Sequence, residues 1–516
     1  MGASPMGNRD TEATWIYHNG TKHPDGGLLN PHHHYDPMRN PLLFKIYEGM
    51  DPVPLSLDTP PLNMPALSAI GTITASSGDA QVPDVSAVAK ILHLSAGITK
   101  TIHFPWGDMP FRAAACTGGL YHIELYLVCD DLPGLEAGVY HFDPGRTVLT
   151  CLRKGDYRHA LVEATGNEPA VVNAPAVLVY TDVFWRNAVK YQAREYRHAF
   201  WDSGTIIANT LATAVACGLP ANVVTGFMDS SVNVLLGLDA LREVTLALVP
   251  VGYAPQPIID LSPEIELLEL ETVPVSDYEI DFPAIRVMHD ASTLGSVEEV
   301  AAFRNRAPVM TRAAPSGTEV SLTFCAPEEI PQVSVEAAIN RRGSTRQFSH
   351  DSITFVELST LLERATQGIP TDFLKAGSSP LNEVHLIVNA VDGLRSGVYV
   401  YHRESQTLEL TRSGEFRREA GQLALNQALG ADASVNVYFV ADLDRITNHL
   451  GNRGYRAAQL EASITAGKLY LGAYALGLGA TGLTFYDDAV IAFLALHAGA
   501  RSVMFLVALG RRAKRR

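Results

Sequence analysis

The sequence predicts an α+β protein made of two tandem copies of one domain that pack together within a single chain. Two observations predict this fold: strand-like and helix-like segments alternate along the chain, and long stretches of sequence recur at a nearly constant spacing. Hydrophobic residues make up 47% of the 516 residues and charged residues 18%, which is the composition of a globular protein. A chain of this length is expected to contain roughly two to four domains.

The repeat is clearest in three pairs of segments that share one offset. GVYHFDPGRTVLTCLRKGDYR (from Gly138), EYRHAFWDSG (from Glu195) and AVACGLPANVVTGFMD (from Ala214) match, in that order, GVYVYHRESQTLELTRSGEFR (from Gly397), GYRAAQLEAS (from Gly454) and AYALGLGATGLTFYDD (from Ala473). A constant offset indicates a duplicated domain rather than shared low complexity. We divide the chain into an N-terminal arm (1–59), expected to be loosely ordered over its first 40 residues, copy one (60–255), an extended, acidic and Pro-rich connector (256–332) and copy two (333–516).

Within each copy, short apolar runs predict strands and a long apolar segment predicts a helix. IELYLVCD and VHLIVNAV have strand character, and GVYHF and GVYVY each open a hairpin. AVLVYTDV and VNVYFVADL are typical of buried central strands. SGTIIANTLATAVACG and ASITAGKLYLGAYALG predict helices that end at Gly and are apolar nearly all round, so we expect them at the interface between the copies. The copies would then form an intramolecular pseudo-dimer about an approximate two-fold axis.

Charge and cysteine content argue against several classes of function. The 40 basic and 55 acidic residues give a net charge of −15, so no broad surface for nucleic acid or an anionic membrane is expected. The five cysteines lack CxxC spacing, which argues against disulfides or zinc and favours a reducing cytoplasm. We expect no signal peptide and no membrane span, because no apolar run approaches roughly 20 residues. The consecutive His32, His33 and His34 cannot easily converge on one metal ion.

One segment at the front of copy two has the chemistry of an anion site. In EAAINRRGSTRQF (336–348), Arg341, Arg342 and Arg346 flank Ser344 directly after a short amphipathic helix. Guanidinium groups and a hydroxyl offer charge-assisted hydrogen bonds that suit a phosphate monoester. A solvated basic helix end is the alternative interpretation of the same residues.

Two features resemble the FMN-dependent nitroreductase superfamily: the pattern RRxSxRxF ahead of the predicted helix FVELSTLLERATQGI, and GLGATGL after the Ala-rich helix. The resemblance implies a three-layer α/β/α fold in which the Arg-Ser-Arg segment binds the FMN phosphate, joined by a C-terminal arginine, here Arg511 or Arg512. GLGATGL, after the Ala-rich helix, does not open a helix after a strand and is therefore not a dinucleotide-binding loop. In the superfamily the matching segment runs beside the flavin ring, and here it comprises Gly479, Ala480, Thr481, Gly482 and Leu483.

The two copies have lost complementary features. Copy one has NMPALSAIGTITASSGDA, without an arginine, where the Arg-Ser-Arg segment should stand, and Pro220 where copy two has Gly479. Copy two has ITNHLGNRGYR where copy one has VKYQAREYR, so the Lys190-Tyr191 pair is found in copy one alone. The Tyr-Arg pairs at 196–197 and 455–456 occur in both copies, which favours a structural role at their interface.

A narrower resemblance links the chain to the SagB-type dehydrogenases, the thiazoline- and oxazoline-oxidising branch of this superfamily. WIYHNGTKHPDGG (15–27) looks like their N-terminal signature, and Lys190-Tyr191 matches their catalytic pair. RAAACTGGLYHIELYLV is similar to their R-x-x-P-S-x-G-x-L-Y-x-x-E-x-Y segment, with Ala115 and Cys116 in place of Pro and Ser. That segment reaches the flavin of the partner subunit, which implies cofactor contacts from Arg112, Cys116, Thr117 and Gly118.

Aromatising an azoline ring requires the loss of a proton from a ring carbon and the transfer of a hydride to the flavin. The reaction therefore needs a base with a pKa near the working pH. Partial burial would lower the pKa of Lys190 from its usual value of about 10.4, and Tyr191 could share the proton. A snorkelling lysine beside an amphipathic tyrosine is the structural alternative.

The sequence therefore predicts an FMN-dependent azoline dehydrogenase acting on a peptide-derived or carrier-bound substrate, with one composite site per chain. Copy two would hold the FMN, and copy one would supply Lys190 and Tyr191. A general NAD(P)H-dependent nitro or quinone reductase and a flavin-free scaffold that docks a biosynthetic partner are the alternatives. Association into a larger homo-oligomer stays open.

Overall fold

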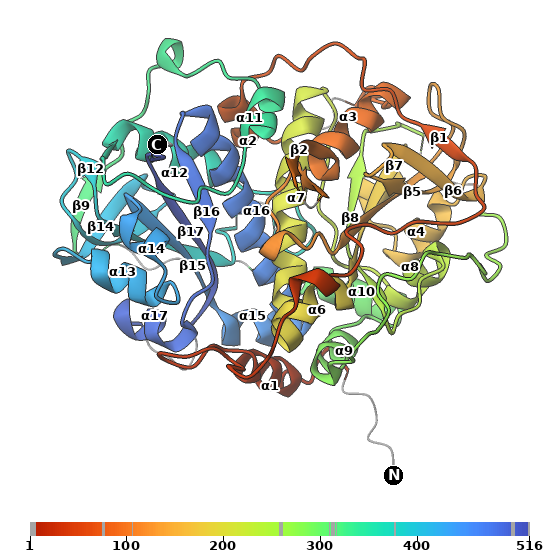
Figure 1. Ribbon diagram of the computed structural model, residues 1–516. Helices are drawn as coiled ribbons and strands as arrows, with labels where there is room; N and C mark the ends of the chain where they lie inside the picture. The colour runs from red at the N-terminus through yellow and green to blue at the C-terminus, as the bar shows by residue number, and fades with distance from the viewer. Residues whose placement is uncertain are drawn as a thin grey trace.

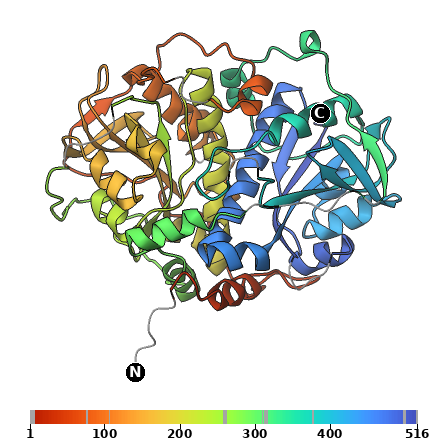
Figure 2. The same cartoon turned by 180° about the vertical axis from the view of Figure 1, so that it is seen from behind.

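Two long helices, one from each copy, lie side by side at the centre of the molecule (Figures 1 and 2). They are α7 (Glu195–Ala216) and α16 (Arg453–Ala475), and both are buried nearly all round. Small residues let them approach closely, because a Cβ added at Gly204 would collide with Ser463 of the other helix. The computed structural model describes residues 7–74, 78–105, 107–256, 262–308, 310, 315, 317–375, 378–496 and 501–513.

Copy one is a three-layer domain around an antiparallel sheet. Side chains alternate along β4: Leu125 and Leu127 pack with α7, whereas Tyr126 and Val128 pack under α4 and α8. Helices therefore cover both faces of the sheet, as the predicted α/β/α arrangement requires. The strands, in spatial order, are β1 (Pro52–Pro54), β6 (Val148–Lys154), β5 (Gly138–Asp143), β4 (Ile123–Cys129), β7 (Ala176–Val183) and β8 (Glu243–Val251).

Copy two repeats this plan, and Figure 1 shows α13, α14 and α17 on the side of its sheet away from α16. All strand pairs of the sheet are antiparallel. Its strands, in spatial order, are β16 (Gly479–Gly482), β17 (Arg501–Gly510), β15 (Val435–Asp442), β11 (Asn382–Val388), β13 (Gly397–His402), β14 (Thr407–Ser413) and β9 (Thr318–Ser321). The predicted α+β class and the tandem duplication are confirmed.

Other helices and short strands complete the two copies. In copy one and the arm they are α1 (Glu12–Gly20), α2 (Ala66–Gly71), α3 (Val85–Ala96), β2 (Ile98–Phe104), β3 (Gly107–Arg112), α4 (Arg158–Ala164), α5 (Pro169–Val172), α6 (Phe184–Tyr191) and α8 (Asp229–Leu236). In copy two they are α11 (Val335–Arg341), β10 (Ile353–Thr354), α12 (Phe355–Ala365), β12 (Val391–Asp392), α13 (Arg417–Leu423), α14 (Ala428–Asp432), α15 (Leu443–Leu450) and α17 (Asp487–Phe493). Among the described residues, no helix combines the length and the apolar character needed to cross a bilayer.

The arm and the connector are more ordered than the sequence predicted. Helix α1 docks on copy two, where the Thr14 backbone N–H and hydroxyl both donate to Asn452 Oδ1. The connector is not extended throughout, because it contains α9 (Pro283–Ala291) and α10 (Val297–Asn305). Ile285 and Met288 of α9 are buried, so an amphipathic pattern within the Pro-rich composition was overlooked.

Two buried ion-pair clusters join the copies and are related by the repeat. Arg194 and Arg197 of copy one contact Asp487 of copy two, with N–O distances of 3.2 and 2.5 Å. Arg453 and Arg456 of copy two contact Asp229 of copy one at 2.6 and 2.8 Å. The Tyr-Arg pairs of the sequence thus lie at the interface, as predicted, since Arg197 and Arg456 belong to them.

Replacing Asp229 by asparagine is expected to lower the free energy of unfolding by about 3–5 kcal/mol, because two arginines are left buried without a counter-charge. Burial disfavours the carboxylate, but the charges of Arg453 and Arg456 outweigh burial and lower the pKa of Asp229. This stabilisation is therefore present above a pH of about 4, the unfolded-state pKa, and is lost as the pH falls further. Denaturant unfolding curves measure the difference. Asp239→Asn, at an exposed ion pair, is the control and should change stability by at most about 1 kcal/mol; equal effects of the two variants would contradict the expectation.

Candidate active site

The Arg-Ser-Arg segment and the GATG strand, far apart in the sequence, lie against each other in copy two. Helix α11 is capped by Ser334, whose hydroxyl accepts from the Ala337 backbone N–H, and it ends at Arg341. The following loop runs beside β16, where Thr345 N–H donates to the Ala480 carbonyl at 3.0 Å. Tyr474 of α16 donates its hydroxyl to the Gly343 carbonyl. Both predicted parts of the cofactor site are thus brought together.

The arginines of this loop have different partners. Arg342 reaches into copy one, donating from Nε to the Ala113 carbonyl at 2.7 Å and from Nη2 to the Arg112 carbonyl at 3.0 Å. Arg341 and Arg346 are exposed, and no ion pair or hydrogen bond from either guanidinium to another described residue is found. The Ser344 hydroxyl hydrogen-bonds with Tyr470. Arg341 and Arg346 therefore remain available to a phosphate, whereas Ser344 lies against Tyr470 and Arg342 mainly joins the copies.

Of the two C-terminal arginines, Arg512 lies at this loop and Arg511 does not. The guanidinium carbon of Arg512 is 5.3 Å from the ring centroid of Tyr474. A Cβ added at Gly479 would collide with Thr345 and with the Arg512 side chain, so the position requires glycine. Arg511 instead forms an ion pair with Glu357 at 2.9 Å. Of the two arginines proposed for the phosphate, Arg512 thus lies beside the Arg-Ser-Arg loop, whereas Arg511 is paired with a carboxylate.

The segment 112–118 of copy one forms the wall that faces this loop. Arg112 is buried and donates to the Leu43 and Ile123 carbonyls inside copy one, so its side chain supports the wall from within. Cys116 Sγ donates to Asp202 at 2.9 Å, and Thr117 donates to the same carboxylate from its backbone N–H and its hydroxyl. Burial, followed by the charge of Asp202, raises the pKa of the Cys116 thiol.

Behind this wall lies a buried polar cluster that the sequence analysis missed. His122 Nε2 is 2.8 Å from Asp202, and its Nδ1 is 2.7 Å from Asp182 and 3.3 Å from Glu195. Burial opposes protonation of His122, but Asp182 and the other carboxylates outweigh burial and raise its pKa. The sequence contained a signal for Asp202, because the repeat gives it a carboxylate counterpart, Glu461, in copy two. Glu461 accepts hydrogen bonds from the backbone N–H groups of Leu381 and Asn382, as Asp202 does from that of Thr117.

Lys190 and Tyr191 end helix α6 beside this wall. Lys190 Nζ lies 5.2 Å from the ring centroid of Tyr191, and a Cβ added at Gly118 would lie 2.8 Å from the Tyr191 hydroxyl. Gly118, which has φ +67°, therefore makes room for Tyr191. Burial, followed by the charge of Arg346, lowers the pKa of Lys190. Arg346 belongs to copy two, so the charge of the Arg-Ser-Arg loop acts on Lys190 across the interface.

The N-terminal arm covers the Lys-Tyr pair, which the sequence did not indicate. Lys190 Nζ lies 5.0 Å from the ring centroid of Tyr35. His33 Nε2 is 2.8 Å from the Val189 carbonyl, and Asn30 Nδ2 is 3.4 Å from Gln192 Oε1. The arm thus places an aromatic ring on the ammonium group, where the ring face stabilises positive charge.

The duplicated fold agrees with comparison to known proteins. The nitroreductase family matches the chain twice, over residues 83–253 and 339–511. The chain belongs to the nitroreductase family. Membership places it among oxidoreductases, with the Arg-Ser-Arg loop inside the second nitroreductase match and the Lys-Tyr pair inside the first.

Two curated relatives are named as processing proteins. The trifolitoxin-processing protein TfxB of Rhizobium leguminosarum bv. trifolii is 30% identical over 166 residues, covering 31% of this chain and 44% of that protein. The microcin B17-processing protein McbC of Escherichia coli is 31% identical over 131 residues, covering 24% and 47%. The chain spans about half the length of these relatives. The predicted relationship to McbC-like nitroreductases is confirmed.

A solved structure from Anabaena variabilis, described as a nitroreductase, matches the whole tandem arrangement. It has a TM-score of 0.76 and 24% identity, and the match covers 97% of this chain and 99% of that chain. At this identity the match shows the fold, and it confirms that both nitroreductase copies form one continuous architecture.

Proposed function

We propose that this nitroreductase is an FMN-dependent dehydrogenase of the SagB type that oxidises thiazoline or oxazoline rings in a peptide-derived natural product. The observation that supports this most is that segment 112–118 of copy one packs against Tyr191 at Gly118 and also accepts hydrogen bonds from Arg342 of copy two. The names of the two processing proteins support the substrate class. The five cysteines form no disulfide, which suits the cytoplasm we expect.

The residues of copy two fit FMN. Its phosphate needs cationic and hydroxyl donors, and Arg341, Ser344 and Arg346 offer them beside Arg512. The flat ring needs a wall without side chains, which the glycines of β16 provide, since Gly479 has no space for a Cβ. Copy one lacks the arginines and has Pro220 at the matching position. We therefore expect one FMN in each chain.

The Lys-Tyr pair supplies the proton chemistry of the proposed reaction. When bound, FMN would accept the hydride removed from the azoline ring. Lys190 Nζ, with its pKa lowered by burial and Arg346, is suited to take the proton from the ring carbon. Burial and then Asp202 raise the pKa of Tyr191, so its hydroxyl keeps its proton and donates a hydrogen bond to the substrate. Reoxidation of the reduced flavin by dioxygen would complete the cycle.

The proposed activity is tested with a purified, flavin-loaded chain and a synthetic peptide that contains one thiazoline. We expect the peptide to lose two mass units in the presence of dioxygen. Rapid reduction of nitroaromatic compounds by NADPH, without azoline oxidation, would instead identify a general nitro or quinone reductase. A protein purified without flavin that still captures a biosynthetic partner would identify a scaffold.

Replacing Tyr35 by leucine is expected to move the acidic limb of the pH–rate profile to lower pH by up to about one unit. Lys190 acts as a base only when neutral, and the ring of Tyr35 stabilises its ammonium form. Losing the ring therefore lowers the pKa of Lys190. Steady-state rates across the pH range measure the shift. Tyr35→Phe keeps the ring and should keep the profile; a leucine variant with the same profile would contradict this role of the arm.

A further inference from the structure

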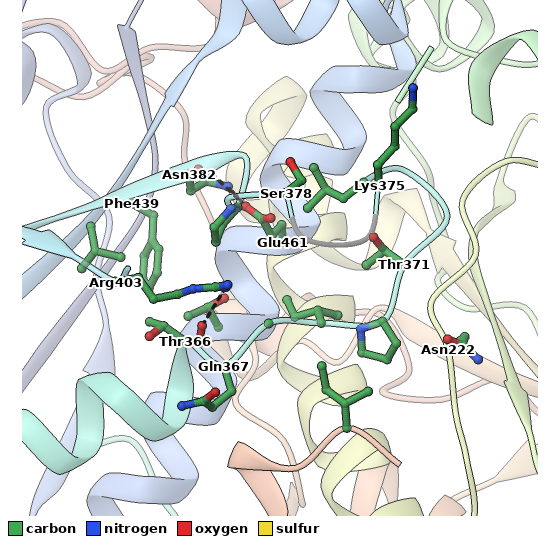
Figure 3. A pocket seen from close by; sticks show the side chains of 18 residues that line it. Asn222, Thr366, Gln367, Thr371, Lys375, Ser378, Asn382, Arg403, Phe439 and Glu461 are labelled. Carbon is green, nitrogen blue, oxygen red and sulfur yellow. Dashed lines mark hydrogen bonds between the residues drawn. The ribbon is translucent and has the colours of Figure 1, made fainter. Parts of the chain in front are cut away.

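A cavity lies between the copies, and neither Lys190 nor Tyr191 lines it. Its volume is about 420 Å³, which is within the usual range for a small-molecule site. Copy two contributes most of its lining, including residues 366–371, Arg403 and Glu461, and copy one contributes Ile73 and Asn222. Figure 3 shows Arg403 extending across the cavity toward Thr366.

The repeat identifies this cavity as the counterpart of the proposed flavin site. Asn222 occupies in copy one the position of Thr481 in copy two, and Glu461 occupies the position of Asp202. In copy one, the segment equivalent to β16 is covered by residues 370–372 of copy two. Val223 N–H donates to the Pro370 carbonyl at 2.8 Å, and Asp372 N–H donates to the Val223 carbonyl at 3.2 Å. The site has been remodelled, and a cavity remains.

The polar groups of the cavity are unevenly satisfied. Arg403 Nη1 donates to the Thr366 carbonyl at 3.2 Å, which leaves most of its five N–H donors for another acceptor. Behind Gly368, the buried Lys468 donates to the Gly368 carbonyl at 2.8 Å. Glu461, in contrast, accepts hydrogen bonds from Leu381 and Asn382. The cationic residues that line the cavity itself are Arg403 and Lys375, while its carboxylate is already hydrogen-bonded.

Two buried polar atoms at the cavity have no hydrogen-bond partner among the described residues. They are Asn382 Oδ1 and Thr371 Oγ1, and the residue Asn382 is only 5% exposed. An unsatisfied buried acceptor calls for an N–H or O–H donor, because leaving it unpaired destabilises the folded protein. A ligand that matches this cavity carries a carboxylate for Arg403 and an amide N–H for Asn382.

We infer that this cavity binds an acidic segment of a peptide, with a carboxylate on Arg403 and a backbone N–H on Asn382. The identification of the peptide as substrate or partner rests on the proposed function, whereas the binding itself does not require flavin chemistry. The former cofactor site of copy one would then serve for peptide recognition, and the cofactor site of copy two for oxidation.

The test is isothermal titration of the flavin-loaded protein with the tetrapeptide acetyl-Gly-Glu-Gly-Glu-amide. We expect saturable binding, and a 10- to 100-fold weaker affinity for Arg403→Gln, since a charge-assisted pair is lost. Arg395→Gln, at an exposed arginine of the same copy, is the matched control and should bind as the parent does. The same peptide with Gln in place of Glu should bind at least 10-fold more weakly.

Absence of saturable binding, or equal affinity of the Arg403 and Arg395 variants, would overturn the inference. Inorganic phosphate that binds with a dependence on Arg403, when the peptide does not, would also overturn it and indicate a phosphate site. The flavin content and the azoline oxidation rate of the same preparations report separately on the proposed function. Peptide binding without azoline oxidation would contradict the proposed reaction and leave this site standing.

Discussion

Replacing Lys190 by methionine is expected to reduce the rate of azoline oxidation by roughly 100- to 10,000-fold, the usual contribution of a general base. Methionine keeps the length of the side chain and its contact with the rings of Tyr35 and Tyr191, so the fold and the flavin should be retained. Single-turnover reduction of the bound flavin by a thiazoline peptide isolates the chemical step.

The matched control is Lys154→Met, at an exposed lysine of the same copy. It should oxidise the peptide at the parent rate. A Lys190→Met variant that keeps its flavin and reduces it at the parent rate would remove the catalytic role of Lys190. If the variant also lost its flavin, Lys190 would be assigned to the binding of the cofactor.

Replacing Arg346 by glutamine is expected to weaken FMN binding by about 10- to 100-fold, because one charge-assisted contact to the phosphate is lost. The same change should move the acidic limb of the pH–rate profile to higher pH. The charge of Arg346 lowers the pKa of Lys190, so removing it raises that pKa and leaves less neutral lysine at a given pH. Tyr35→Leu and Arg346→Gln should thus shift the profile in opposite directions.

Flavin titration and steady-state rates at saturating FMN measure both effects of Arg346→Gln. Arg418→Gln, at an exposed arginine on the outer helix α13, is the control and should change neither. Weaker FMN binding with an unchanged pH profile would separate the phosphate role of Arg346 from the proposed influence on Lys190. Unchanged FMN affinity would contradict the placement of the phosphate.

Much of the fold could be predicted from the sequence, because the duplication leaves local patterns in both copies. AVLVYTDV corresponds to β7 (Ala176–Val183), and the Ala-rich segments correspond to the central helices. Those helices begin further upstream than predicted: α7 already includes Glu195, since polar residues there are buried in ion pairs rather than solvated. Composition alone does not show such pairing.

The candidate site was predicted in part. Lys190, Tyr191 and the Arg-Ser-Arg loop could be placed together because the repeat implied an interface. Tyr35 could not be linked to Lys190, since no local pattern records a contact between such distant residues. The partners of Arg112 and Arg511 could not be predicted, because sequence shows the charge of an arginine but not the carbonyl or carboxylate that it contacts.

The amount of FMN bound by each chain tests the central claim most directly. It is measured by absorbance of the purified protein, with the flavin released and quantified against the protein concentration after saturation with FMN. One FMN per chain is the result we predict, because only copy two has the phosphate donors and the glycine-lined wall. Two FMN per chain would contradict a single composite site formed by Lys190 of copy one and the flavin of copy two.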